Sequence, residues 1–265
     1  MKMYQPFALT LTALLLILSL SGCYTVPITG RTSLNLVSEG DEFQLGMQAY
    51  SDAKSQAKIS SDPVANERVT RIGKKIAQVS HHPEWDWEFT VFDDPETPNA
   101  WCLPGGKVAV YSGLFPYAKT DGELATVMAH EISHAIARHG AERMSQQMVQ
   151  AAGAAVVAET VANEHIETAK VVYGIGSDLF VMLPYSRKHE YEADRIGLIY
   201  MAEAGYNPNE ALTFWKRFSE MPKGVNIEFL STHPADENRI QQIKDYLPEA
   251  MAAYTNATMK TSSGQ

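Results

Sequence analysis

Three residues in one short stretch, His130, Glu131 and His134, have the types and spacing of a metal-dependent catalytic site. On an α-helix, positions four apart project from one face about one turn apart, so the two imidazoles could bind a single tetrahedral zinc ion. Glu131 would lie beside them, placed to accept a proton from a water activated by that ion. The alternative is a helix that carries two surface histidines.

A third zinc ligand is expected on a second helix further along the chain. Glu190 and Asp194 are also four residues apart, so they share a helical face. Glu190 could bind the metal, and Asp194 could accept a hydrogen bond from the distal N–H of a ligating histidine. The small residues Ala193 and Gly197 would let this helix pack closely against the first. The alternative for Glu190 is a charged helix surface.

Two neighbouring residues are not expected to take part. His139 is nine residues from His130, which places it on roughly the opposite side of a continuing helix, as a structural or surface residue. Glu192 would lie about 200° around the helix from Glu190 and face solvent.

Cap and strand patterns place these residues on secondary structure. Thr120 with Glu123 three residues later is a capping box that begins the first helix, and Gly140 is a natural end for it. Apolar alternation over 86–92 predicts a half-buried strand, with 107–111 as its partner. Further helices are expected from Ser38 to about 58, after Asp62-Pro63 and after Asn207-Pro208, where each first residue is a favourable cap.

The sequence resembles a family of zinc metalloproteases that includes the CAAX prenyl protease and HtpX, and within it the bacterial lipoprotein relatives with a single catalytic domain. The resemblance runs from about Glu39 to about Ile240. The motifs that carry it are His130-Glu131-Ile132-Ser133-His134, Glu190 with Ala193-Asp194, Asn99-Ala100, Pro104-Gly105-Gly106, and His233-Pro234 with Arg239-Ile240.

The resemblance implies an α+β fold, a mainly helical domain with a small sheet whose edge strand borders the zinc cleft. It also implies one Zn²⁺ per chain, with His130, His134 and Glu190 as ligands and Glu131 as the catalytic residue. An extended substrate would pair with the sheet edge through its backbone. The residues expected beside that cleft are Asn99, Ala100, Gly105 and Gly106, for which an ordinary hairpin loop is the alternative.

A motif near the end of the chain is expected to contribute to catalysis. His233 would donate a hydrogen bond to the oxyanion of the tetrahedral intermediate, with Arg239 nearby to orient it, and one such donor typically contributes about 3 kcal/mol. The alternative is a helix cap, because Pro234 suits the first turn of the final helix.

The N-terminal residues predict export and lipidation. An apolar run from Phe7 to Leu20 is too short for a spanning helix and suits a signal peptide. Leu20-Ser21-Gly22-Cys23 resembles a bacterial lipobox, so we expect 1–22 to be removed and Cys23 to carry lipid. The alternative is a simple membrane anchor. Tyr24 after the cysteine favours the periplasmic face of the outer membrane.

The expected domain organisation follows from these motifs. A tether spans 23–37, a single metalloprotease domain 38–254, and a disordered polar tail 255–265. Residues 144–182 carry too many charges to span a membrane and are expected to form one or two small-residue helices that could cover the cleft. Cys102 is expected to be a small core residue.

Charge excludes one class of partner. The formal net charge is −9, and removal of Lys2 with residues 1–22 makes it −10, so no electrostatic attraction to nucleic acid is expected.

The expected function is zinc-dependent hydrolysis of peptide bonds in unfolded or damaged cell-envelope proteins. The alternative is a periplasmic chaperone or assembly factor that holds extended strands of outer-membrane proteins, with the outer-membrane protein assembly machinery as a further partner. A third hypothesis is a metal-binding lipoprotein without catalysis.

Overall fold

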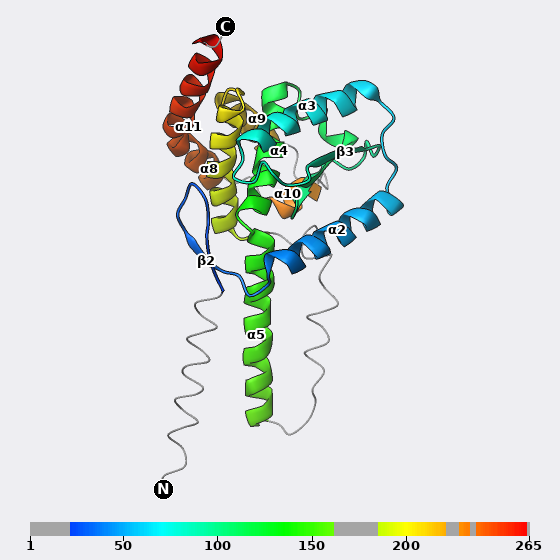
Figure 1. Cartoon of the computed structure of the whole chain (residues 1–265), viewed down its shortest axis with the longest axis vertical. Helices are drawn as coiled ribbons and strands as arrows, with labels where there is room; N and C mark the ends of the chain where they lie inside the picture. Colours follow the sequence, from blue (N-terminus) through cyan, green and yellow to red (C-terminus); the bar gives the residue numbers. More distant parts are fainter. Residues whose placement is uncertain (1–21, 162–184, 221–227, 234–236, 264–265) are drawn as a thin grey trace.

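The computed structural model describes residues 22–161, 185–220, 228–233 and 237–263 (Figure 1). The helices are α2 (Glu39–Gln56), α3 (Pro63–Val79), α4 (Asp121–Ile136), α5 (His139–Val161), α8 (Arg187–Glu203), α9 (Asn209–Ser219), α10 (Glu228–Thr232) and α11 (Glu237–Ser263), with a short 3₁₀ turn at Ser112–Leu114. The strands are β1 (Cys23–Thr25), β2 (Thr32–Leu34), β3 (Glu88–Phe92), β4 (Ala100–Leu103) and β5 (Lys107–Tyr111). This mostly helical arrangement with small sheets confirms the predicted α+β class.

The larger sheet has the order β3-β5-β4. The predicted strands β3 and β5 do pair, in parallel, with Glu88 opposite Lys107. The segment between them, for which an ordinary loop was one interpretation, forms a third strand, β4, antiparallel to β5. A turn at Gly105 and Gly106, with φ of 83° and 86°, joins β4 to β5. These angles suit glycine because a side chain would clash with the backbone.

Helix α4 is the centre of the fold, in contact with α8 on one side and with β4 and α3 on others (Figure 1). From Gly122 to Ile136 every residue of α4 is buried. The capping box predicted at its start is present, with Thr120 and Glu123 bonded reciprocally. The close approach to α8 depends on Gly197, because a Cβ there would lie 3.0 Å from the backbone nitrogen of His130.

The first helix ends earlier than Gly140. Arg138 adopts a left-handed conformation with φ of 55°, and the chain turns there into α5, which begins at His139. The Arg138 side chain compensates for this conformation, because Nε donates to Glu42 Oε2 at 2.7 Å and Nη2 to the Val37 carbonyl at 3.1 Å.

The segment 23–37 is not an extended tether. Strands β1 and β2 form an antiparallel hairpin that packs on the domain. The Tyr24 hydroxyl donates to the Ile136 carbonyl at 2.8 Å, Val26 is fully buried, and the Arg31 guanidinium binds Glu142 and Glu192. Polar and apolar contacts therefore hold the hairpin against α4, α5 and α8.

The prediction of a disordered tail over 255–265 is also wrong for the residues that the structure describes. Helix α11 continues to Ser263, and Thr255 and Thr258 hydroxyls donate to carbonyls one turn back. Residues 249–260 contain neither glycine nor proline, so helix propensity outweighs their polarity.

Among the described residues, no helix combines the length and apolarity needed to cross a membrane. Helix α5 occupies the first part of 144–182, and the predicted cover from 162 onward lies outside the described residues. The predicted signal peptide over 1–22 lies almost entirely outside them too.

Candidate metal centre

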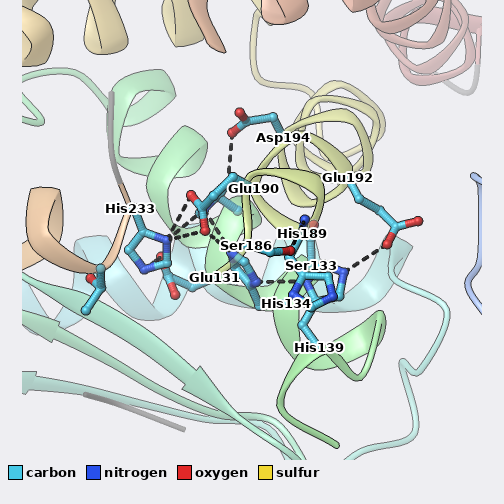
Figure 2. Close-up of polar contacts among 12 residues, drawn as sticks. Glu131, Ser133, His134, His139, Ser186, His189, Glu190, Glu192, Asp194 and His233 are labelled. Atoms are coloured by element: carbon cyan, nitrogen blue, oxygen red, sulfur yellow. Dashed lines mark hydrogen bonds and ion pairs between the residues drawn. The ribbon is translucent and has the colours of Figure 1, made fainter. Parts of the chain in front are cut away.

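Helices α4 and α8 and the residue after α10 bring four potential metal ligands together in the interior, and Figure 2 labels three of them, His134, Glu190 and His233. His130, His134, Glu190 and His233 are all buried, and each offers a ligand atom within 4.8 Å of the others. The Nε2 atoms of His130 and His134 are 3.0 Å apart, and Glu190 lies 3.5 Å and 3.4 Å from them. The predicted pairing of two imidazoles with a carboxylate from a distant helix is present.

This donor set suits zinc. Imidazole nitrogens and a carboxylate oxygen are the ligands that catalytic zinc sites use.

Glu131 follows the first histidine and faces the same interior space (Figure 2). Its Oε1 is buried without a hydrogen-bond partner among the described residues, and lies 3.4 Å from His233 Nε2. Burial raises the pKa of Glu131 to about 7, against the lowering effect of His233 and Arg239. The carboxylate is therefore available as an acceptor inside the site.

His233 lies among the candidate ligands, one residue beyond α10. Its Nδ1 is 3.2 Å from His130 Nε2 and 3.1 Å from Glu190 Oε1. Its backbone N–H donates to the Phe229 carbonyl at 2.8 Å, as an extension of α10. Pro234, the basis of the cap interpretation, lies outside the described residues.

Asp194 lies against His130, as predicted, and Arg239, which was predicted to orient His233, contacts Asp194 and Glu190. Asp194 Oδ1 is 2.9 Å from His130 Nδ1, the ring nitrogen on the far side from the cluster. Arg239 donates to both oxygens of Asp194, from Nε at 2.7 Å and from Nη2 at 2.9 Å, and its Nη1 lies 2.9 Å from Glu190 Oε2. Burial alone would raise the pKa of Asp194, but Arg239 and His130 hold it below its ordinary value.

The guanidinium of Arg239 also packs on an aromatic ring. It lies 3.6 Å from the ring centroid of Trp215, a fully buried residue of α9. A cation over an indole face is stabilised when both are desolvated.

His139 and Glu192 are much closer to the site than predicted. Both are buried, and His139 Nδ1 lies 2.8 Å from His134 Nδ1 while its Nε2 lies 2.9 Å from Glu192 Oε2 (Figure 2). The prediction failed because it assumed one continuous helix, whereas the left-handed Arg138 returns His139 to the same side as His134. No helical periodicity could have revealed this break.

Tyr185 is a second residue that sequence reasoning missed. Its ring stacks on His134 with centroids 3.9 Å apart and 22° between planes, and Arg143 covers the ring at 4.3 Å. Tyr185 directly precedes the Ser186 cap of α8, a position that carries no sequence signal for stacking.

The four residues predicted to border a substrate cleft lie in and around β4. Asn99 and Ala100 are buried at its start, where Asn99 Oδ1 accepts from the Ala100 N–H at 2.9 Å. Gly105 and Gly106 lie at its other end, beside Phe43 and Trp87. Strand β4 is one of the two edge strands of this sheet and contacts α4. A substrate role for these residues stays a prediction.

Cys102 is buried in β4, as predicted for a core residue. Burial raises the pKa of its thiol well above the ordinary value, with a further contribution from Glu131.

Comparison with known proteins agrees with this geometry. Residues 63–247 match the Peptidase family M48. The chain belongs to this family. The match includes every ligand of the cluster, so the family predicted from the sequence is confirmed, and the chain is a zinc-dependent metalloendopeptidase.

Several relatives extend the comparison. The chain is 37% identical over 230 residues to mitochondrial metalloendopeptidase OMA1 of Schizosaccharomyces pombe, covering 85% of this chain and 66% of the relative. It is 34% identical to OMA1 of Saccharomyces cerevisiae, covering 86% and 70%. It is 28% identical to the beta-barrel assembly-enhancing protease of Escherichia coli, covering 83% and 47%.

The M48 chain thus spans about two thirds of the two fungal proteins and about half of the bacterial one. The relatives named here are neither the CAAX prenyl protease nor HtpX, so the sequence resemblance holds at the level of the family.

Proposed function

We propose that this M48 peptidase hydrolyses peptide bonds of unfolded or damaged cell-envelope proteins, with Glu131 as general base and His130, His134 and Glu190 holding the zinc. The observation that carries the proposal is the convergence of these ligands, from α4 and α8, around a buried carboxylate with an unused oxygen. Zinc bound there supplies Lewis acidity, which lowers the pKa of a water and polarises a carbonyl.

The side chains divide the remaining work. Glu131 removes the proton of the attacking water and delivers it to the leaving nitrogen. His233, 3.4 Å from Glu131, donates a hydrogen bond to the oxyanion. Asp194 fixes the ring of His130, and Arg239 holds Asp194.

Substrate is proposed to lie along β4 as an added strand. An edge strand offers unpaired backbone groups, which bind extended chains with little side-chain preference. This suits an unfolded protein as substrate, and Asn99, Ala100, Gly105 and Gly106 would shape the two ends of that edge.

The proposed location is the periplasmic face of the outer membrane, through lipid on Cys23. The lipobox-like sequence supports it, and Cys23 is exposed at the first strand of the described fold. Labelling with a fatty-acid analogue, with Cys23→Ser as control, tests this location: absence of label from the parent chain excludes it.

The proposed mechanism is tested with Glu131→Gln. We expect zinc content to stay near one per chain while digestion of an unfolded protein falls by about 10²–10⁴-fold. Glu67→Gln, an exposed glutamate on α3, is the matched control and should retain full digestion. Equal digestion by Glu131→Gln and the parent chain would remove Glu131 from its role.

A chaperone or assembly role is the second candidate, supported by similarity to a protease named for enhancing β-barrel assembly. Complementation of cells that depend on the protein distinguishes strand binding from hydrolysis. Full complementation by Glu131→Gln favours strand binding, and loss of complementation favours hydrolysis.

A further inference from the structure

The carboxylate of Glu192 is buried and fully engaged, although it is not one of the proposed zinc ligands. Its Oε1 accepts from the Thr29 hydroxyl at 2.6 Å, and its Oε2 accepts from Arg31 Nε at 2.7 Å. The same Oε2 lies 2.9 Å from His139 Nε2. The hairpin formed by β1 and β2 therefore supplies two of the three donors on this carboxylate.

Arg31 is itself held in place. Its Nη1 and Nη2 donate to both oxygens of Glu142 at 2.9 and 2.7 Å. Glu142 also lies 3.1 Å from His189 Nε2, and the His189 ring stacks on His139 at 4.3 Å. A bidentate pair of this kind fixes the guanidinium in one geometry.

These contacts decide which ring nitrogens carry protons. An ionised carboxylate only accepts hydrogen bonds, so His139 must donate to Glu192 through Nε2–H. A neutral His139 then accepts at Nδ1, and its neighbour 2.8 Å away, His134 Nδ1, is the donor. This leaves the Nε2 lone pair of His134 directed to the cluster, where His130 Nε2 is 3.0 Å away.

His130 has a similar set of partners with one residue fewer. Its Nδ1 contacts Asp194 without an intervening histidine, and Arg239 of α11 donates to both oxygens of that carboxylate. Glu192 and Asp194 follow Glu190 by two and four residues in α8, and each is held by an arginine, Arg31 near the start of the chain and Arg239 near its end.

We propose that Arg31 and Glu192 act through His139 as positioning residues, which fix His134 as the Nδ1–H tautomer so that its Nε2 binds zinc. This rests on the proposed function in that His134 is a ligand. It makes the N-terminal hairpin a component of the zinc site, separate from any part in membrane attachment.

The test is zinc affinity, measured by chelator competition on the full chain carrying Glu192→Gln, His139→Phe or both. Each single change should weaken zinc binding about 10–100-fold, the usual effect of losing an outer partner of a ligand. The double variant should be no weaker than the worse single variant, because both changes interrupt one series of contacts. Multiplied effects in the double variant would contradict a shared route.

A spectroscopic measurement separates positioning from general destabilisation. In the zinc-free parent chain, ¹⁵N NMR should show His134 protonated at Nδ1, and Glu192→Gln and His139→Phe should lose that single tautomer. Arg195 lies on α8, as Glu192 does, and forms an exposed pair with Glu249 of α11. Arg195→Gln is therefore the matched control and should change neither readout.

The outcomes distinguish this inference from the function on which it rests. Unchanged zinc affinity in Glu192→Gln and His139→Phe, with affinity lost in His134→Ala, overturns the positioning role and leaves His134 as a ligand. Unchanged affinity in His134→Ala overturns both.

Discussion

At the scale of single residues, the centre depends on which partner each buried charge has. Arg239 is fully buried and contacts Asp194, Glu190 and the face of Trp215. Two carboxylates in the interior would be unfavourable without this guanidinium, because an unpaired buried charge carries a large desolvation cost. Its planar fork satisfies both at once, which a single ammonium does not.

Arg239→Lys should therefore destabilise the chain although it keeps the charge. The bidentate contact to Asp194 and the contact to Glu190 cannot both be kept, and we expect a loss of about 2 kcal/mol. Urea unfolding of zinc-free protein measures it. Arg195→Lys, in the exposed pair with Glu249, should change stability by less than about 0.5 kcal/mol. Equal small effects in both variants would contradict the special role of Arg239.

The lowered pKa of Glu142 makes the free energy of unfolding depend on pH. Burial opposes ionisation, but hydrogen bonds from His189 and Arg31 lower the pKa of Glu142 to about 2 from an ordinary 4.5. Its contribution is thus present above about pH 4.5 and is lost as the pH falls toward 2. Allowing for partial exposure, about 2 kcal/mol is expected.

Glu142→Gln should remove that contribution. The stability difference between the parent chain and the variant should be largest above pH 5 and should shrink toward pH 2. Denaturant unfolding of both in chelator, so that loss of zinc does not contribute, measures the difference. A constant difference across this range would contradict the assignment.

At the scale of elements, the zinc site requires two helices at unusually short separation. Gly197 of α8 lies against the backbone of α4 at Ala129 and His130. A side chain there would move Glu190 away from the two histidines, so this contact links helix packing directly to ligand geometry.

Gly197→Ala tests the link. A Cβ would meet backbone atoms at 3.0–3.2 Å, so the helices must separate slightly, with an expected loss of about 1–3 kcal/mol and weaker zinc binding. Gly40→Ala on α2 is the control, because its Cβ would meet nothing closer than Ser38 Oγ at 3.9 Å. Calorimetry and chelator competition should show an effect only for Gly197.

The sequence predicted the positions of the candidate ligands well and the turns poorly, for a physical reason. The spacing within each pair, and the Thr120 cap, are local properties of a single helix. The pair His130 and His134 on α4 and the pair Glu190 and Asp194 on α8 were therefore placed correctly. The left-handed conformation of Arg138 depends on distant contacts to Glu42 and Val37. Tertiary contacts of this kind leave no periodic pattern, and the position of His139 was missed with them.

At the scale of the whole molecule, zinc and folding are coupled. The ligands come from α4 and α8, and their nearest support comes from α11 and the hairpin. Metal that binds only this assembled state stabilises it by mass action.

Removal of zinc should therefore lower the melting temperature. Zinc at about one hundred times its Kd adds about 2.7 kcal/mol, which corresponds to roughly 5–10 °C for a chain of this size. Thermal unfolding with and without chelator measures it, and His134→Ala should show no such difference. A shift that persists in His134→Ala would place the stabilising metal elsewhere.

The position of Arg239 in the sequence has a consequence for biosynthesis. A ribosome that has completed α4 and α8 has made every proposed ligand from those helices, yet Asp194 and Glu190 still lack their guanidinium until residues 204–239 are added. A nascent fragment that stops before Arg239 leaves two buried carboxylates without their guanidinium, and we expect such a fragment to be inactive as a protease.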